Sequence, residues 1–370
     1  MEEVALLSHR GFWQDKRVLV TGHTGFKGGW LCHWLDMMGS RVTGLSLAPQ
    51  MPDNLFTSTG IADFVDDRRG DVRNPEYVTS CILESQAEII FHLAAQPLVR
   101  ASYGVPRDTF AVNIMGTVNV LESARSVRSV RAVVIVTSDK CYQNLETFRP
   151  YRESDAIGGH DPYSASKGCA ELVTASYRKS FFAVGNDTGV ASARAGNVIG
   201  GGDWAADRIV PDCVRAFTLA QPVVLRRPQS IRPWQHVLDP LSGYLLLAEA
   251  LCEKPHDLAH SYNFGPQATE IRRVEDVVKL AASMWGEGAC WECHGEDHLH
   301  EAGILTLDST LARQHLGWKP RWSLEMAMAS TIEWYRLQRS GNSMTELTRQ
   351  QILSYAASPP FDAGVEHEYC

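Results

Sequence analysis

The chain has 370 residues, of which 44% are hydrophobic and 21% are charged, and its formal net charge is −8. This composition is typical of globular proteins and excludes a chain that is disordered over most of its length. The length indicates one large α/β domain or two domains. The acidic balance argues against nucleic acid as the main partner, because a phosphate backbone needs a cationic surface.

Two further features bear on where the protein works. No apolar run approaches the ~20 residues that cross a bilayer, and the segment 1–17 lacks the apolar stretch of a secretion signal. The nine cysteines are odd in number and irregularly spaced, which is typical of reduced thiols. We therefore expect a cytoplasmic protein with no membrane partner.

The first half of the chain alternates β-branched runs with amphipathic stretches. Such alternation predicts βαβ units and a parallel sheet, with ligands bound beyond the carboxyl ends of the strands. The patterns predict strands at 17–22, 41–47, 88–95, 131–138 and 189–200, and helices at 26–39, 75–86, 108–126 and 164–180.

These elements predict an α/β fold with a Rossmann-type doubly wound parallel sheet. We assign residues 1–190 to this dinucleotide-binding domain and expect the strand near 189–198 to return to it. After residue 200 glycine and arginine are dense and the elements look shorter. Residues 191–370 are therefore expected to form mainly a smaller, mixed domain that binds the substrate.

The segment TGHTGFKG (21–28) places Gly22, Gly25 and Gly28 between a predicted strand and a predicted helix. Gly22 permits a tight turn, Gly25 lets the backbone approach a pyrophosphate, and Gly28 lets the helix pack on the strand. The start of the helix then offers N–H groups to the phosphates. A dinucleotide site is favoured over a glycine-rich turn without a ligand.

The end of the second strand indicates which dinucleotide binds. An acid there would bind the 2′-hydroxyl of the adenosine ribose, and an arginine would suit a 2′-phosphate. The strand ends in Gly44, Leu45 and Ser46, with neither residue type directly after it. We predict NAD rather than NADP. Asp71 either accepts a hydrogen bond from the adenine amino group or is an ordinary turn residue or helix cap.

Tyr163 and Lys167 are four residues apart and share one face of a predicted helix. A phenol with a pKa near ~10 is a poor base at neutral pH. An adjacent ammonium stabilises the phenolate, which can then remove a hydroxyl proton while a hydride leaves the same carbon. The alternative is an exposed pair with no role.

In order along the chain, TGHTGFKG, HLAAQ (92–96), Thr137-Ser138, YSASK (163–167) and RAGNVIGGGDW (194–204) resemble the motifs of the extended short-chain dehydrogenase/reductase family. The resemblance covers residues 13 to 340 and includes LGWKP (316–320). It implies a Rossmann-type domain, a tightly held nicotinamide cofactor, a nucleotide-sugar substrate and a Ser–Tyr–Lys site.

Carried over to this chain, Ser138 would hydrogen-bond the reacting sugar oxygen, Tyr163 would be the base and Lys167 would orient the ribose. Ser138 could otherwise be only a strand-end cap. The resemblance also implies further NAD contacts at Thr24, Phe26, Ser46, Asp71, Val72, Leu93, Ala94, Ala95 and Asn113, besides the glycines of the loop.

Ser138 is followed by Asp139 and Lys140. In the 4-epimerases of the family these positions are small and non-ionisable, whereas the 4,6-dehydratases carry Asp and usually Glu. A dehydratase must expel the C6 hydroxyl, so Asp139 is the expected acid. Lys140 departs from the usual Glu, which leaves the base for the C5 proton open between Lys140 and shared electrostatic stabilisation of the enolate.

The Asp139-Lys140 pairing, HLAAQPLVR (92–100) and the segment 196–212 are similar to the subgroup of these dehydratases that uses CDP-D-glucose, which makes CDP-D-glucose the expected substrate. The alternatives are a 4-epimerase, a dehydratase of another nucleotide-glucose, and a catalytically silent protein that binds NAD. By analogy with the family, a homodimer or homotetramer is expected.

Arginines in the second half suit a diphosphate, because the guanidinium fork matches phosphate oxygens. The candidates are Arg194, Arg208 and Arg232. The resemblance assigns Asn197 and Arg232 to the phosphates and Arg208 to the base pocket, and it adds Gln96 as a substrate contact. The alternative for the arginines is surface solvation.

Cys290 and Cys293 stand at the spacing of a haem attachment site, and His294, His298 and His300 follow. Haem attachment requires export and a closed zinc site requires four well-placed ligands. We interpret this segment as a solvated loop and predict no metal.

Overall fold

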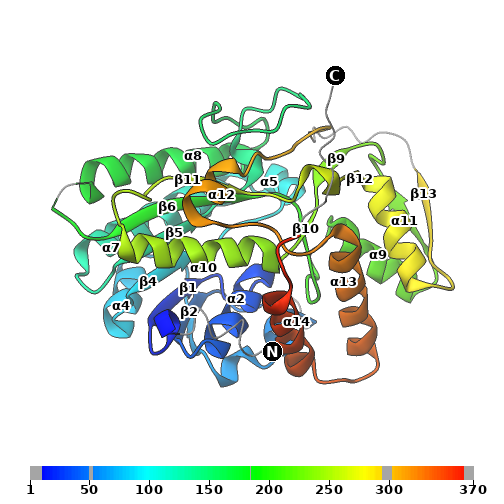
Figure 1. Ribbon diagram of the computed structural model, residues 1–370, viewed down its shortest axis with the longest axis horizontal. Coiled ribbons are helices and arrows are strands. Elements are labelled where there is room, and N and C mark those ends of the chain that lie inside the picture. The colour runs from blue at the N-terminus through cyan, green and yellow to red at the C-terminus, as the bar shows by residue number, and fades with distance from the viewer. Residues whose placement is uncertain (1–10, 50–52, 184, 294–301, 362–370) are drawn as a thin grey trace.

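A parallel sheet of seven strands forms the centre of the computed structural model, which describes residues 11–49, 53–183, 185–293 and 302–361 (Figure 1). Its strand order is β11-β6-β5-β4-β1-β2-β3, and all neighbours pair in parallel. The order reverses between β1 and β4, and doubly wound sheets bind ligands at such a point. The strands are β1 (Arg17–Thr21), β2 (Arg41–Ser46), β3 (Asp66–Arg69), β4 (Ile89–His92), β5 (Ala132–Val136), β6 (Gly189–Ala195) and β11 (Ser261–Phe264).

The Rossmann-type sheet predicted from the sequence is thus confirmed, and five of its strands lie where the patterns place them. The largest difference is at β6, which ends at Ala195 rather than at 200, and β4 ends at His92 rather than at 95. Beyond His92 the Leu93 backbone N–H still bonds the Thr21 carbonyl (3.1 Å), and the chain then leaves the sheet. The segment 93–95 is therefore a loop at the carboxyl edge, where a ligand can reach it.

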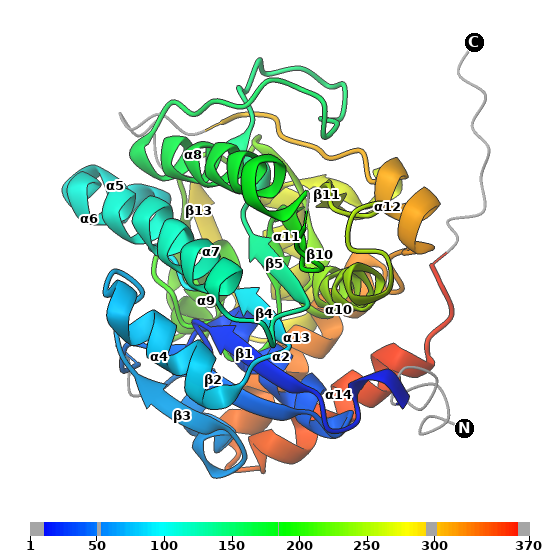
Figure 2. The same ribbon diagram turned by 90° about the vertical axis from the view of Figure 1, so that its left-hand side faces the viewer.

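Helices cover both faces of the sheet (Figure 2). One face carries α4 and α7, which pack on each other, and α8 beside α7; the other carries α2 and α10, with α14 packed on α2. The bounds are α2 (Phe26–Met37), α4 (Pro75–Ser85), α5 (Val99–Gly104), α6 (Pro106–Phe110), α7 (Gly116–Ser126), α8 (Pro162–Tyr177), α10 (Leu238–Glu253) and α14 (Met344–Ala357).

The expected helix 108–126 is interrupted by a π-helical turn, η2 (Ala111–Met115), between α6 and α7. Such turns are frequent at functional sites. Asn113 lies in this turn and is buried. Its side chain donates to Ser166 Oγ (2.8 Å) and accepts from the Gln96 backbone N–H (2.9 Å). The interruption therefore ties α8 to the loop after β4.

The second half of the chain contributes to the central sheet as well as to a smaller region. The strand β11 extends the sheet beyond β6, and α10 packs on β5 and β6. In Figure 1 the helices α9, α11 and α13 gather on the side away from α4 and α7. That smaller region holds α9 (Ile209–Thr218), α11 (Val274–Trp285), α13 (Leu324–Arg339) and the strand pairs β7 (Val198–Ile199) with β10 (Gln235–His236), β8 (Pro222–Leu225) with β13 (Cys290–Cys293), and β9 (Ile231–Pro233) with β12 (Ile271–Arg273). Of the remaining helices, α3 (Leu55–Ser58) packs on α2, and α12 (Thr310–Leu316) packs on α10 and β11.

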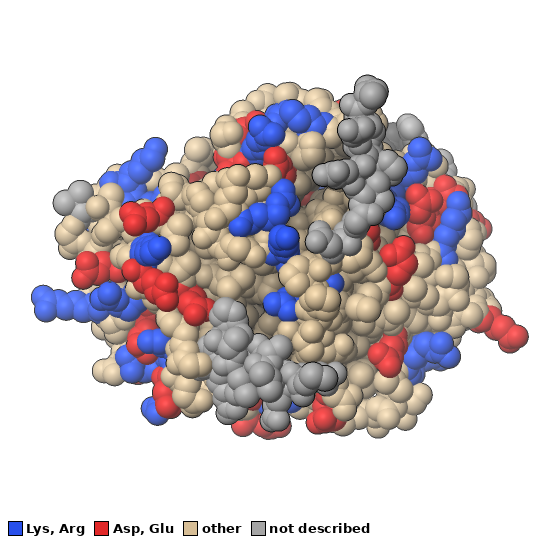
Figure 3. Space-filling model, in the orientation of Figure 1, with Lys and Arg blue, Asp and Glu red and all other residues tan. Residues whose placement is uncertain are grey.

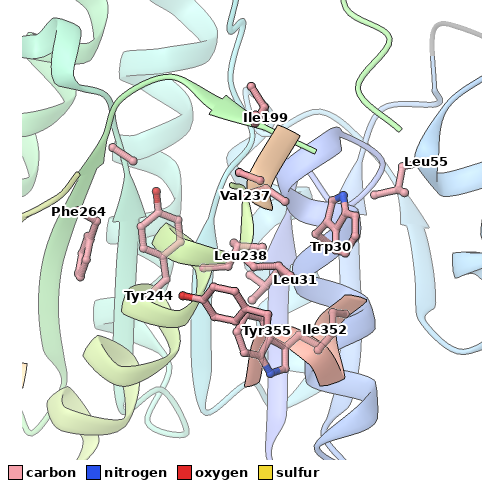
Figure 4. Packing of buried hydrophobic residues seen from close by; sticks show 14 of the residues in the cluster. Trp30, Leu31, Leu55, Ile199, Val237, Leu238, Tyr244, Phe264, Ile352 and Tyr355 are labelled. Atoms are coloured by element: carbon pink, nitrogen blue, oxygen red, sulfur yellow. The ribbon is translucent and has the colours of Figure 1, made fainter. Parts of the chain in front are cut away.

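The largest apolar cluster joins these parts. Figure 4 shows Trp30 and Leu31 of α2 packed near Val237 and Leu238 at the start of α10, with Tyr355 of α14 beside them. All five side chains are fully buried. Because α2 begins at the glycine loop and α10 begins at the substrate half, this packing fixes the two halves against each other.

One buried acid in this cluster makes stability depend on pH. Burial raises the pKa of Asp239 to about 7, although the Arg321 backbone N–H and the Tyr355 hydroxyl bond its carboxyl. A raised pKa means that the protonated form is favoured in the folded protein, so its stabilisation is complete below pH 4 and is lost as pH rises through 7. Its second oxygen, Oδ2, lacks a hydrogen-bond partner within the described residues.

We expect Asp239→Asn to remove this contribution, because the amide stays neutral at every pH. At pH 8 the free energy of unfolding of the variant should exceed that of the parent by roughly 2–4 kcal/mol, so the variant should unfold at a higher denaturant concentration. At pH 4 the variant should be no more stable than the parent. Urea unfolding of both proteins across this range checks the prediction. A constant difference between them at all pH values would contradict it.

Within the described ranges, no helix combines the length and apolar character needed to cross a bilayer. On the face shown in Figure 3, basic and acidic side chains are interspersed.

Candidate active site

The glycine loop between β1 and α2 has the close packing that the sequence predicts. Gly22 has a φ of +78°, and a Cβ on it would lie 2.8 Å from the Ala94 backbone nitrogen. A Cβ on Gly28 would lie 2.2 Å from the Gly22 carbonyl oxygen. Larger residues are therefore excluded at both positions.

The same loop fits a pyrophosphate. Gly25 is exposed, and it is the N-cap of α2 without any side chain that caps the first turn. That turn carries no acidic residue. Its N–H groups and the positive end of the helix dipole therefore stay open for an anion at the switch point of the sheet.

The loop is also tied to the end of β2. Thr24 Oγ1 lies 2.8 Å from Ser46 Oγ and donates to the Leu47 carbonyl (3.1 Å). Asp71, beyond β3, pairs with Arg73 (2.6 Å), which lowers the pKa of its carboxyl.

Other predicted cofactor contacts line the same edge of the sheet. Val72 is buried, and its carbonyl accepts from Asn119 (2.9 Å), so it belongs to the core under this edge. Phe26 packs near Gly200, where an added Cβ would lie 3.1 Å from its ring. Leu93 and Ala95 lie in the loop after β4.

Ser138, Asp139 and Tyr163 form a buried group at the end of β5. Ser138 Oγ donates to Asp139 Oδ1 (2.9 Å), and its hydroxyl opposes the rise in the pKa of the Tyr163 phenol. The three side chains are 7%, 2% and 8% exposed. The expected base and the expected acid therefore share the Ser138 hydroxyl as a neighbour.

Tyr163 is held in place by the start of α8. Asp161 caps this helix by accepting from the Ser164 backbone N–H (2.9 Å), and Pro162 occupies its first turn. One turn further on, Lys167 Nζ donates to the Val136 carbonyl (3.1 Å) at the end of β5. Burial raises the pKa of Tyr163 to about 12 and lowers the pKa of Lys167 to about 8.

Asp139 lies near several cationic side chains, but within the described residues no side chain forms a direct ion pair with it. Burial raises the pKa of its carboxyl, and the charges of Lys140, Arg232 and Lys27 oppose this shift. Its Oδ2 is buried and lacks a hydrogen-bond partner among the described residues. A Cβ on Gly196 would lie 3.0 Å from that oxygen. The acid thus faces the loop that follows β6.

Two of the four predicted substrate residues lie at this site. Arg208 bonds Asp203 (2.7 Å), and its charge acts on both Lys27 and Tyr163. Arg232 is buried; it donates to the Gly303 carbonyl (3.1 Å) and also bonds the Ala302 carbonyl.

The other two behave differently. Gln96 uses its side-chain amide for internal contacts, donating to Thr109 Oγ1 of α6 (2.9 Å) and accepting from the Leu98 backbone N–H (2.6 Å). Asn197 is half-buried, and its carbonyl bonds the Gln235 backbone N–H (3.1 Å).

Arg194 does not take part in a diphosphate site. It is buried and pairs with Glu171 (2.7 Å), and it also donates to the Tyr142 hydroxyl (2.8 Å). The expectation of a phosphate ligand at this position is therefore wrong. A buried carboxylate needs its counter-ion, and Glu171 also accepts from Ser192 (2.7 Å) on β6.

Sequence reasoning missed two residues of the site. Lys27 lies inside the glycine segment, between Phe26 and Gly28, and the sequence assigned it no role; its Nζ donates to Tyr244 Oη of α10 (3.4 Å). The available signal for Lys27 was a charged residue at a non-glycine position of the glycine motif. Tyr244 is separated from it by 217 positions, and nothing in the sequence joins them.

Comparison with known proteins decides the family. Residues 19–331 match the family described as GDP-mannose 4,6 dehydratase. The chain belongs to this family. A Salmonella typhimurium member with the name CDP-glucose 4,6-dehydratase is 47% identical over 354 residues, which cover 94% of this chain and 98% of that protein.

Solved structures share the fold of this dehydratase family. The epimerase Mth375 of Methanothermobacter thermautotrophicus has a TM-score of 0.78 at 22% identity, with 93% of this chain and 97% of that chain covered. MoeE5 in complex with UDP-glucuronic acid and NAD has a TM-score of 0.74 at 25% identity, with 87% and 99% covered.

No group of three or more potential metal ligands occurs in the described part of this family member. Cys290 and Cys293 are exposed and free. The three histidines that follow them, His294, His298 and His300, lie outside the described residues. The absence of a metal therefore stays a prediction.

Proposed function

We propose that the protein is an NAD-dependent hydro-lyase that converts CDP-D-glucose into CDP-4-dehydro-6-deoxy-D-glucose and water. The observation that carries this proposal is the buried Asp139 carboxyl, which accepts a hydrogen bond from Ser138 close to Tyr163. The 47% identity to the Salmonella CDP-glucose 4,6-dehydratase supports the choice of substrate.

The first step in this proposal is oxidation at C4 of the hexose. Tyr163 removes the proton of the 4-hydroxyl, Ser138 bonds the same oxygen, and Lys167 stabilises the phenolate. NAD, when bound, supplies the acceptor for the C4 hydride and later returns that hydride. The open first turn of α2 and the loop around Gly25 would hold its pyrophosphate.

The second step is loss of water across C5 and C6. The 4-ketone makes the C5 proton acidic, and Asp139 protonates the departing C6 hydroxyl. Burial raises the pKa of Asp139, which favours the protonated form that this step requires. We assign Lys140, next in the chain, to the C5 side of the reaction together with the electrostatic stabilisation of the enolate.

The protons balance within the site. Asp139 gives its proton to the departing C6 hydroxyl, which leaves as water, and the proton that Tyr163 took from the 4-hydroxyl then passes by way of Ser138 Oγ to Asp139. Each of the three groups is buried, so this path needs no solvent. After the hydride returns to C6 and a proton returns to C5, the acid and base are in their starting states.

The nucleotide part of the substrate is proposed to lie against the smaller region, with Arg232 and Asn197 at the diphosphate and Arg208 at the mouth of the base pocket. Residues 1–190 would bind NAD and 191–370 would mainly bind the nucleotide sugar. We further propose a homodimer or homotetramer in the cytoplasm, whose product feeds synthesis of deoxysugars and of the lipopolysaccharide O-antigen.

A substrate panel tests the proposal. The protein is incubated with NAD and with CDP-, UDP-, dTDP- or GDP-glucose, and the products are weighed by mass spectrometry. CDP-glucose should be the best substrate and should give a product that is lighter by one water. A product of unchanged mass with inverted C4 would indicate the 4-epimerase instead. Unchanged CDP-glucose with bound NAD would contradict both enzymes.

A further inference from the structure

Lys27 and Tyr244 form a second lysine–tyrosine pair in the site. Lys27 is the second residue of α2 and is half-buried. Its Nζ lies 3.4 Å from Tyr244 Oη and 5.8 Å from the centroid of the same ring. Tyr244 is fully buried and packs edge-on against Phe264 (Figure 4). The ammonium is thus fixed between the glycine loop and α10.

The pair lies within electrostatic reach of the reacting groups, although it comes from the opposite face of the sheet. The charges that act on Lys27 are those of Arg208, Lys167 and Asp139. Tyr244 in turn feels the charges of Tyr163 and Asp139. Burial, reinforced by Arg208 and Lys167, lowers the pKa of Lys27 to about 7.

The position of Lys27 indicates which part of the cofactor it meets. The loop that contains it is the pyrophosphate cradle, and Tyr163 must face the hexose carbon that gives up a hydride. The nicotinamide ring has to lie between that cradle and that carbon, within the same group of side chains. No step in the proposed reaction uses Lys27, so its charge needs another role.

A positive charge distinguishes the two redox forms of nicotinamide. The oxidised ring carries a positive charge and the reduced ring is neutral. An ammonium beside the ring therefore raises the free energy of the oxidised form and leaves the reduced form nearly unaffected. The effect persists in a buried site because salt screens it little.

We propose that Lys27 poises the cofactor: its ammonium, held by Tyr244, favours the reduced over the oxidised nicotinamide and so promotes hydride removal from the sugar. This inference rests on the proposed function in taking NAD as the cofactor. Lys27 acts only through its charge on the nicotinamide ring and exchanges no atom with the substrate.

The test is the ratio of the dissociation constants of NAD+ and NADH, measured separately by quenching of tryptophan fluorescence without any sugar. Lys27→Met should lower the ratio Kd(NAD+)/Kd(NADH) roughly tenfold at pH 6, since a like charge near the ring is removed. Lys27→Arg should keep the ratio. Lys179→Met, an exposed lysine on another helix, is the matched control and should change nothing.

The wild-type protein supplies a second test that needs no variant. Its ratio should fall as pH rises from 6 to 9, because Lys27 loses its proton. The groups that face Lys27 are Asp139, Lys167, Arg208 and Tyr244, and of these Lys167 also has a pKa lowered to about 8. Lys167 is present in every variant, so the part of the fall that is missing in Lys27→Arg belongs to Lys27.

The outcomes separate the two proposals. An unchanged ratio in Lys27→Met, or equal weakening of both forms as for a phosphate ligand, would overturn the role of Lys27. A lowered ratio in a protein that removes no water from CDP-glucose would leave that role intact and overturn the proposed function. If the wild-type protein bound neither NAD+ nor NADH, NAD would be contradicted as the cofactor.

Discussion

Asp139→Asn is expected to stop the loss of water while largely preserving oxidation at C4. Asparagine has nearly the same shape and its Oδ1 still accepts from Ser138, so Tyr163 keeps its neighbour. The amide cannot deliver a proton to the C6 hydroxyl, and a missing general acid typically costs roughly 10²–10⁴-fold in rate. Reduced nicotinamide should therefore accumulate on the enzyme when CDP-glucose is added.

Stopped-flow absorbance of reduced nicotinamide and mass analysis of the product separate the two steps. Asp187→Asn, which makes the same change at an exposed carboxyl, is the control. Equal loss of oxidation and elimination in Asp139→Asn would remove the acid role from Asp139. Formation of the dehydrated product at the parent rate would do the same.

The raised pKa of Asp139 also fixes the sign of a pH effect. The acid works only in its protonated form, so elimination should decline as pH rises through the pKa of Asp139. Oxidation at C4 requires the Tyr163 phenolate and should change in the opposite direction. Oxidation is therefore expected to limit turnover at low pH, and elimination is expected to limit it at high pH.

The residues whose positions follow from the sequence share one property: their neighbours are close in the sequence or are set by sheet topology. Tyr163 and Lys167 are one helical turn apart, and Ser138 follows a strand whose carboxyl end must face the ligand. Periodicity and turn chemistry suffice for such positions. The glycine loop is predictable for the same reason.

Contacts between distant segments decide the remaining positions. Arg194 looks like a phosphate ligand in its glycine-rich setting, but β6 places it opposite Glu171 of α8, and a buried carboxylate requires a partner. Lys27 looks like a variable position of the loop until α10 brings Tyr244 to it. Asn113 in the π-helical turn likewise bonds Ser166 of α8, a contact that one-dimensional periodicity does not show.

Tyr163→Phe should suppress the first hydride transfer. The variant keeps the ring that packs at the start of α8 and removes only the hydroxyl, so folding should be preserved. Without the phenolate, the 4-hydroxyl proton has no acceptor while the hydride leaves, and the rate should fall by roughly 10²–10⁴-fold. Mixing the NAD-bound variant with CDP-glucose should then give no rise in the absorbance of reduced nicotinamide.

The comparison with Asp139→Asn makes this result specific. Both variants would lack dehydrated product, but only Asp139→Asn should accumulate reduced nicotinamide, because only there does oxidation precede the block. Tyr142→Phe, whose hydroxyl bonds Asn263 away from the site (2.7 Å), is the control for loss of a buried phenol. Rapid nicotinamide reduction by Tyr163→Phe would mean that another group, with the Ser138 hydroxyl nearest, is the base at C4.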